Sequence, residues 1–192
     1  MRVLVACEFS QVVTKAFRER GHEAYSCDLL PTEGNRDWHI QGDVLAHLAD
    51  GWEAMIAHPP CTFLCNSGVR WLHERPARWR QMAEAIVFFN GLLAAPIKRI
   101  AVENPIQHKY ARQHIRKPDQ IIQPYHFGDM QSKATCLWLK GLPPLMASFT
   151  GGEGIRQDCF KATPSPDRGK LRSRTFRGIA QAMAEQWGME TE

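Results

Sequence analysis

The sequence of 192 residues contains no apolar run long enough to span a bilayer, and its six cysteines include no C-x-x-C pair. The first absence argues against an integral membrane protein, and the second argues against a zinc ribbon or finger. The apolar N-terminal stretch ends at Cys7, which is too short for a signal peptide and predicts a buried first strand. Without an export signal we expect no disulfide framework. We therefore expect a cytoplasmic protein, in a bacterial or phage-infected cell, whose cysteines are mostly small buried side chains.

The sequence also lacks internal repeats and a clear domain boundary. With 44% hydrophobic and 23% charged residues, its composition is ordinary for a soluble globular protein. The length allows one domain with a sizeable core. We therefore expect a single domain over residues 1–192, with a short loop-rich insertion at 140–171.

The net charge of +4 is unevenly distributed along the chain. Residues 98–117 contain six Lys or Arg against one acidic residue, and residues 156–177 contain seven against two. Lys and Arg side chains release counterions from nucleic-acid phosphates, so two basic segments favour a polyanionic partner. The alternative is a solvated surface with spare positive charge.

Apolar runs and helical spacing alternate in a way that is typical of a doubly wound α/β sheet. The opening unit is a strand over 3–7, a helix over 12–20 that stops at Gly21, and a strand over 22–27. Further patterns predict the following elements: strands near 40–44 and over 52–57, 97–103, 121–125 and 135–139, and helices over 78–94 and 175–187. We expect the last two strands to form an antiparallel pair in an otherwise mostly parallel sheet.

Polar or reactive groups follow most of the expected strands, at the sheet edge where α/β proteins bind ligands. These groups are Glu8-Phe9-Ser10, Asp28, Gly42-Asp43-Val44, Pro59-Pro60-Cys61 and Glu103-Asn104-Pro105. The double proline fixes the backbone and presents the thiol of Cys61 on a loop. Cys61 is the candidate nucleophile, and Cys65, which lacks the proline brace, is its rival.

This series of motifs resembles the DNA cytosine-5 methyltransferase family, which has similar motifs in the same order. The resemblance extends to residues 123–128, to Ser132-Lys133 and to Gly178-Ile179-Ala180, and so covers nearly the whole chain. It implies a Rossmann-like, S-adenosylmethionine-dependent methyltransferase fold, in a compact member compatible with a phage genome.

The resemblance implies that Cys61 adds to carbon 6 of cytosine, which makes carbon 5 nucleophilic enough to accept a methyl group. We expect a positive neighbour or a helix N-terminus to lower the pKa of Cys61. Glu103 would bind ring nitrogen 3, Asn104 would hold the loop that positions Glu103, and Lys133 would complete the catalytic set. No metal is needed.

The implied methyl donor is S-adenosylmethionine. Phe9 and Ser10 would line its pocket, Asp28 would bind the ribose hydroxyls and Asp43 the adenine amino group. The full set of expected donor-binding residues is Glu8, Phe9, Ser10, Asp28, Leu29, Asp43, Val44 and Pro59. Acids at Asp28 and Asp43 are also common at strand ends for purely structural reasons.

Double-stranded DNA is the implied partner of a monomeric enzyme, and the target base would be flipped out of the duplex. The expected DNA-binding residues are Ser67, Arg70, Arg156, Lys161, Arg168, Lys170, Arg172 and Arg174. Because the insertion at 140–171 is small, it can contact phosphates and few base edges. We expect a recognition site of about two to four base pairs.

The sequence departs from the family pattern at three places. Gln11 replaces a glycine in the first loop, Lys133 and Thr135 replace an Arg-x-Arg pair, and the recognition region is very short. Three alternatives remain open: an amino-group methyltransferase, which resembles the chain in His58-Pro59-Pro60, a cytosine methyltransferase acting on free nucleotides, and an inactive DNA-binding relative.

Overall fold

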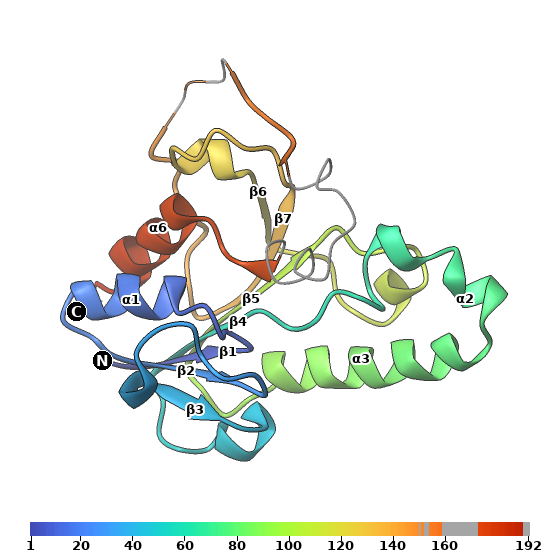
Figure 1. Ribbon diagram of the computed structural model, residues 1–192, viewed down its shortest axis with the longest axis horizontal. Coiled ribbons are helices and arrows are strands. Elements are labelled where there is room, and N and C mark those ends of the chain that lie inside the picture. The colour runs from blue at the N-terminus through green and yellow to red at the C-terminus, as the bar shows by residue number, and fades with distance from the viewer. Residues whose placement is uncertain (150, 152–153, 159–172, 190–192) are drawn as a thin grey trace.

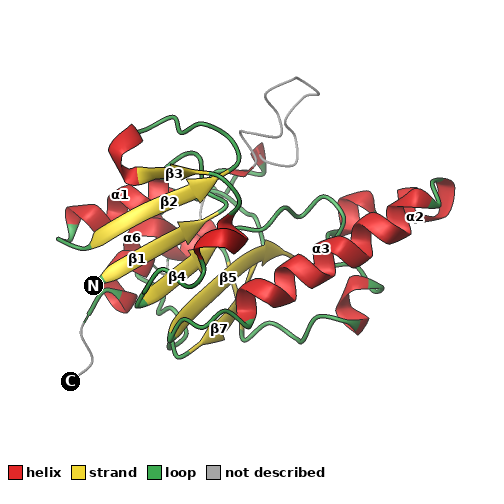
Figure 2. Cartoon of the chain, turned by 90° about the horizontal axis from the view of Figure 1, so that it is seen from below, coloured by secondary structure: helices red, strands yellow, loops and turns green. Residues whose placement is uncertain are grey.

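The computed structural model describes residues 1–149, 151, 154–158 and 173–189. Its strands form one seven-stranded sheet of order β3-β2-β1-β4-β5-β7-β6 (Figures 1 and 2). The strands are β1 (Arg2–Ala6), β2 (Glu23–Asp28), β3 (His39–Gln41), β4 (Ala54–Ala57), β5 (Arg99–Pro105), β6 (Gln120–Ile122) and β7 (Thr135–Lys140). Strands β1 to β5 pair in parallel, whereas β7 runs antiparallel to both β5 and β6. The predicted doubly wound α/β fold and its late antiparallel pair are confirmed.

Helices cover both faces of the sheet (Figure 2). Helices α1 (Val12–Glu19) and α6 (Arg177–Trp187) contact each other on one face, and α3 (Ala77–Leu93) covers the other. The short helix α2 (Trp71–Glu74) packs against α3 at the far end of the molecule (Figure 1). Short 3-10 helices occur at η1 (Arg36–Trp38), η2 (Val44–His47), η3 (Asn66–Gly68), η4 (Ala111–Gln113) and η5 (Pro124–Phe127). None of the helices in the described ranges is long and apolar enough to cross a membrane.

Alternation of side chains along the strands builds two apolar layers, because successive residues of a strand face opposite sides of the sheet. In β1, Val3 and Val5 join the core under α1 and α6, whereas Leu4 and Ala6 join the core under α3. Phe89 of α3 lies on the second layer and contacts the Trp138 ring edge-on, with 4.9 Å between ring centroids. The two layers hold the carboxyl ends of β1, β4 and β5 in fixed positions relative to one another.

The strand predicted over 121–125 is wrong in its second half. Strand β6 ends at Ile122, and η5 begins at Pro124. Proline has no N–H to donate to a sheet ladder and is favoured at the start of a helix. Gln123 and His126 also form a reciprocal cap at this point, which stabilises the turn instead of the strand.

Candidate active site

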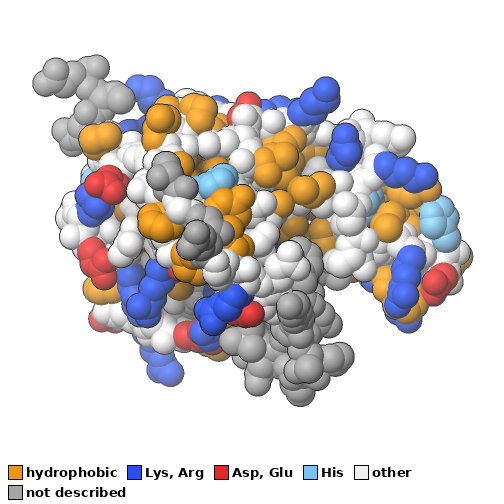
Figure 3. Space-filling model, turned by 90° about the horizontal axis from the view of Figure 1, so that it is seen from above, with side chains coloured by type: hydrophobic (Ala, Val, Ile, Leu, Met, Phe, Trp, Pro, Cys, Tyr) orange, Lys and Arg blue, Asp and Glu red, His pale blue; other side chains and the backbone are white. Residues whose placement is uncertain are grey.

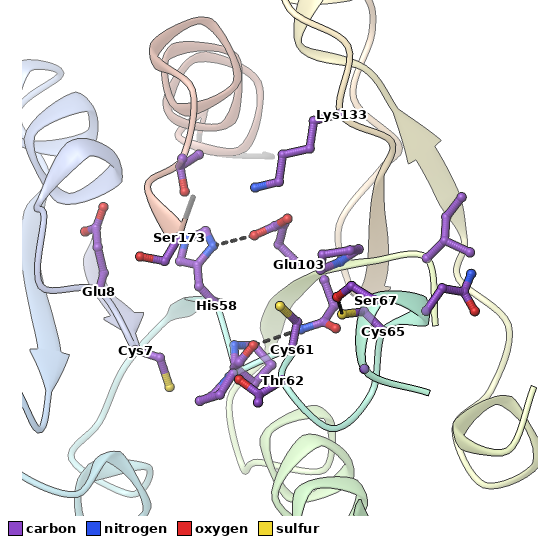
Figure 4. Close-up of a pocket in the computed structure, with 18 of the residues that line it drawn as sticks. Cys7, Glu8, His58, Cys61, Thr62, Cys65, Ser67, Glu103, Lys133 and Ser173 are labelled. Atoms are coloured by element: carbon purple, nitrogen blue, oxygen red, sulfur yellow. Dashed lines mark hydrogen bonds and ion pairs between the residues drawn. The ribbon is translucent and has the colours of Figure 1, made fainter. Parts of the chain in front are cut away.

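An open pocket of about 1010 Å³ lies at the carboxyl edge of the sheet, beyond the ends of β1, β2, β4 and β5. The sequence-predicted residues that line it are Glu8, Phe9, Ser10, Asp28, Pro59, Cys61, Ser67, Glu103, Asn104 and Lys133. Figure 4 shows Cys61 and Glu103 on one side of His58, and Cys7 and Glu8 on the other. The predicted donor side and the predicted base side therefore share a single pocket.

The loop that carries Cys61 begins directly after β4 and is fixed at both ends. The His58 amide donates to the Ala6 carbonyl oxygen at 2.9 Å, which extends the ladder between β4 and β1. The side-chain amide of Asn104, at the end of β5, donates to the Pro59 carbonyl oxygen at 2.8 Å. After Cys61, the amides of Leu64 and Cys65 both donate to the Cys61 carbonyl oxygen at 3.0 Å, which closes a tight turn.

The segment after β5 supports the far side of the same loop. The His108 amide donates to the Leu64 carbonyl oxygen at 2.9 Å, and its imidazole Nε2 lies 3.0 Å from the Phe63 carbonyl oxygen. The Ala111 amide donates to the other ring nitrogen of His108, so Nε2 carries the hydrogen and donates to Phe63. The nucleophile loop is thus held by two neighbouring strands and by the segment that follows β5.

Cys61 and Cys65 form a coupled pair of thiols in this loop. The hydrogen bond between them raises the pKa of Cys61, as does burial, and the same bond lowers the pKa of Cys65. The Ser67 hydroxyl, 3.0 Å from Cys65 Sγ, adds to this lowering. The expected lowering of the pKa of Cys61 is therefore wrong in direction: the bond to Cys65 and burial raise it, although the positive charge of Lys133 lowers it. Of the two thiols, Cys65 has the lowered pKa.

Glu103 extends from β5 into the pocket and is 12% exposed. Its Oε2 lies 3.0 Å from Nδ1 of His58, whose side chain is 7% exposed. Burial raises the pKa of Glu103, but the hydrogen bond from His58 and the positive charge of Lys133 outweigh it, so that the pKa lies below its usual range. Glu103 is therefore ionised at neutral pH in the free protein.

The loop after β1 forms the other side of the pocket. Glu8 is 4% exposed, and its carboxylate accepts hydrogen bonds from the Val13 and Thr14 amides at 2.7 and 3.2 Å and from the Thr14 hydroxyl at 2.7 Å. These bonds satisfy the first amides of α1, so Glu8 acts as the cap of that helix. Phe9 and Ser10 line the pocket beside it.

Gln11 has a left-handed backbone, with φ of 58°, in which glycine is normally favoured. Its side chain is fully buried and does not line the pocket. The amide donates to Ser26 Oγ and to the Asn35 carbonyl oxygen, and its oxygen accepts from the Asn35 amide at 2.7 Å. The backbone thus adopts the conformation of a glycine, and the additional side chain braces the loop over residues 33–35.

Three predicted donor-binding residues lie outside the pocket lining. Leu29 is 73% exposed, and its neighbour Leu30 lines the pocket instead. Val44 is buried in the core under α3. Asp43 accepts a hydrogen bond from the Leu45 amide at 3.0 Å and so caps η2. Asp28 does reach the pocket, where its Oδ1 accepts from the Leu30 amide at 2.9 Å.

The predicted DNA-binding residues are scattered. Ser67 contacts Cys65, and Arg70 is exposed with its guanidinium 4.3 Å from the centroid of the Trp71 ring. Arg156 is exposed beside Asp158, and Arg174 forms an ion pair with Glu33 at 2.6 Å. Lys161, Arg168, Lys170 and Arg172 lie outside the described residues, as does half of the predicted insertion at 140–171.

Two functional residues were missed or underrated in the sequence. His58 precedes the double proline, and its position directly after a buried strand was the available signal. Nothing local in the sequence connects it to Glu103, 45 positions away. Cys65 was treated only as a rival nucleophile, because its contact with Cys61 depends on the turn that follows the prolines.

Comparisons with known proteins identify no family. No protein-family model matches the sequence, and no curated protein matches it. Among solved structures, the chain is similar to an E. coli protein described as a prophage-encoded DNA modification methyltransferase, with 15% identity, a TM-score of 0.49, and coverage of 86% of this chain and 56% of the other. It is also similar to the S. pombe Dnmt2 methyltransferase, with 15% identity, a TM-score of 0.47, and coverage of 84% and 53%. The chain spans about half the length of these structures.

Proposed function

We propose that the protein is an S-adenosylmethionine-dependent methyltransferase that modifies carbon 5 of cytosine in DNA. One observation carries the proposal: Cys61 and Glu103, from adjacent strands, line the same pocket as Phe9, Ser10 and Asp28. A thiol and a carboxyl group in one pocket match the two tasks of this reaction, addition to carbon 6 and stabilisation of ring nitrogen 3.

Cys61 supplies the nucleophile in this proposal. Its proton passes to the Cys65 thiolate as the Cys61 sulfur bonds to carbon 6, because the two thiols are already hydrogen-bonded. Lys133 favours the charge that develops on Cys61, since it lowers the pKa of that thiol. Cys65 thus acts as the base for Cys61.

The donor fits the other side of the pocket. Asp28 lies at the carboxyl end of β2, one strand away from the β1 loop, where an acidic residue commonly binds ribose hydroxyls. Phe9 and Ser10 would hold the rest of the donor, whereas Asp43 and Val44 do not line the pocket and are not assigned. When bound, S-adenosylmethionine supplies an electrophilic methyl group.

DNA is the proposed substrate because the surface near the pocket combines Arg and aromatic side chains. Arg70 and Arg75 both lie over the Trp71 ring, at 4.3 and 4.5 Å from its centroid, and Trp71 lines the pocket. Figure 3 shows Lys and Arg side chains around this α2 and α3 end of the molecule. The target cytosine would leave the duplex to reach Cys61.

The test is incubation of the protein with radiolabelled S-adenosylmethionine and duplex DNA of varied sequence, followed by mapping of the labelled atom. We expect label on carbon 5 of cytosine and a covalent complex with 5-fluorocytosine DNA. Label on an exocyclic nitrogen would instead identify an amino-group methyltransferase. Faster transfer to dCMP than to DNA would identify a nucleotide enzyme, and tight DNA binding without transfer would identify an inactive relative.

Matched serine variants identify the attacking sulfur. Cys61→Ser should form no covalent complex, whereas Cys65→Ser should still form one, more slowly, because Cys61 has lost its base. Fragmentation of the trapped peptide over residues 55–70 locates the adduct. An adduct on Cys65 would reverse the two roles.

A further inference from the structure

His58 forms a buried pair with Glu103 but has no part in the reaction proposed above. Nδ1 of His58 lies 3.0 Å from Oε2 of Glu103, and both side chains line the pocket beside Cys61 (Figure 4). The ionised carboxylate can only accept, so Nδ1 carries the hydrogen and donates it to Oε2. Oε2 is thereby the oxygen that accepts from His58, and Oε1 takes no part in this bond.

The other ring nitrogen of His58 argues against a purely structural role. Nε2 is buried and has no hydrogen-bond partner among the described residues. A buried unpaired polar atom costs free energy, and such atoms in native proteins call for an explanation such as a role in a site. The ring therefore lines the pocket with Nδ1 committed to Glu103 and with Nε2 buried and unsatisfied by the described residues.

The charged and titratable groups around the pair come from three sides. Lys133, on the connection between β6 and β7, faces Glu103 and lowers its pKa, and the Cys61 thiol faces it from the loop after β4. The Cys136 thiol of β7 also feels the negative charge of Glu103. His58 holds a carboxylate oxygen of Glu103 through a hydrogen bond of 3.0 Å.

We propose that His58 is a positioning residue that holds Oε2 of Glu103, so that Oε1 faces ring nitrogen 3 of cytosine; Oε1 takes up a proton from water as the base binds and then passes it to nitrogen 3. The proposal rests on the cytosine-5 chemistry proposed above. A carboxyl group that could rotate freely would present either oxygen to the cytosine ring. The reacting atoms would then be aligned less often, which lowers the rate of reaction.

The atoms balance along the reaction. The Cys61 sulfur bonds to carbon 6, the electrons of the ring shift so that carbons 4 and 5 form an enamine, and nitrogen 3 takes the proton from Oε1. Carbon 5 would then take the methyl group of S-adenosylmethionine, whose thioether product leaves. Its own proton would pass to a water molecule as the bond between carbon 6 and the Cys61 sulfur breaks, and Cys61 would take its proton back from Cys65. Nitrogen 3 then returns its proton to Glu103. The hydrogen between His58 and Oε2 stays in place throughout.

Two polar variants of similar size separate positioning from general stability. His58→Asn places an amide donor near the position of Nδ1, whereas His58→Gln places it near the position of Nε2. The readouts are the rate of adduct formation with 5-fluorocytosine DNA over a range of pH, and the pKa of Glu103 by carbon NMR, assigned with Glu103→Gln. Thermal unfolding of each variant checks that it is folded.

We expect His58→Gln to slow adduct formation by about 10²-fold, as for loss of one aligned donor in an active site, and His58→Asn to retain most of the rate. The limb of the pH profile set by Glu103 should move to higher pH in His58→Gln, because Glu103 loses the bond that favours its ionised form. His58→Asn should keep the limb near that of the wild type.

Equal rates and equal limbs in the wild type and both variants would overturn this inference alone. A wild-type protein that forms no adduct with cytosine would overturn the proposed function, and this inference with it. An equal loss of rate in both variants with an unchanged pKa of Glu103 would reduce His58 to a structural residue.

Discussion

At the scale of single residues, Gln11 combines a left-handed backbone with a fully buried side chain. The left-handed conformation costs an ordinary residue about 1–2 kcal/mol, and hydrogen bonds to Ser26 and Asn35 offset this cost. The replacement of glycine at this position is therefore compensated by contacts with β2 and the following loop, away from the pocket.

Replacing Gln11 by Ala should lower the free energy of unfolding by about 1–3 kcal/mol, because the strain remains while the Asn35 backbone groups lose their partners. Gln11→Gly should lose less, since glycine adopts the left-handed backbone without strain. Urea unfolding measures both variants. A larger loss in Gln11→Gly than in Gln11→Ala would contradict the account.

The contact between Cys61 and Cys65 predicts an unusual pH dependence of thiolate formation. Because the folded-state pKa of Cys65 is lowered by its bonds to Cys61 and Ser67, a thiolate should form below the range of an ordinary cysteine. This thiolate stabilises the folded protein above the ordinary thiol pKa, and the contribution is lost as the pH falls through the lowered value. Thiolate absorbance near 240 nm during a pH titration measures it.

Cys65→Ser should abolish the low-pH thiolate signal. Cys27→Ala is the matched control, because burial and the nearby charge of Asp28 raise the pKa of Cys27 to about 11, and its removal should leave the signal intact. A signal that persists in Cys65→Ser would show that the charge resides on another thiol.

The individual site residues were predictable to the extent that each follows a strand. Cys61 and Glu103 were found in this way, because the carboxyl ends of parallel strands meet at one edge. Asp43 follows a strand equally well, but its carboxylate turns back to cap η2. His58 was missed because its role depends on a partner from a different strand.

At the scale of elements, the bond from Asn104 to Pro59 connects the end of β5 to the loop after β4. Asn104 is 1% exposed. From the sequence we expected Asn104 to hold the loop that positions Glu103. In the structure, its side chain holds the loop that carries Cys61, through the Pro59 carbonyl oxygen. Both reacting groups thus depend on the same pair of strands.

Asn104→Ala should lower the free energy of unfolding by about 1–3 kcal/mol and should slow methyl transfer by about 10²-fold through misplacement of Cys61. Asn90→Ala is the matched control, since Asn90 of α3 also donates its side-chain amide to a carbonyl oxygen, that of His114 at 3.1 Å. We expect the control to be fully active. Equal activity in the two variants, measured by label transfer, would contradict the role of Asn104.

The elements themselves were largely predictable, because buried parallel strands form short apolar runs and α3 repeats apolar residues with helical spacing. Met82, Ile86 and Phe89 of α3 are indeed buried. The failure at 123–125 has a local cause, since Pro124 and the cap between Gln123 and His126 favour a turn over an apparently strand-like run. The 3-10 helices are too short to show a periodic pattern, and local caps such as the bond from the Leu45 amide to Asp43 begin some of them.

At the scale of the whole molecule, the predicted DNA-binding arginines differ in their surroundings. Arg70 lies beside Trp71, on the same lobe as Arg75 and near the pocket. Arg174 is already paired with Glu33, so its contribution to binding of phosphates is reduced. The predicted DNA contact is therefore carried better by Arg70 than by Arg174.

Arg70→Ala should weaken duplex DNA binding similarly for all sequences and reduce the slope of log affinity against log salt by about 1, as for loss of one phosphate contact. Arg20→Ala is the control, because Arg20 pairs with Glu185 at the other end of the molecule. Fluorescence anisotropy at several salt concentrations measures both. Equal slopes in the two variants would remove Arg70 from the DNA interface.

Strands β4 and β5 pair in parallel with Ala57 opposite Val102, one residue before His58 and one before Glu103. Neighbouring strands lie about 4.8 Å apart, so the separation of these two side chains is built into the ladder and does not depend on loop conformation. Under the proposed function, surface loops can therefore diverge in the DNA sequence that they contact while the spacing of His58 and Glu103 stays the same. Engineering of specificity on this scaffold should begin at the rim and leave the two strands untouched.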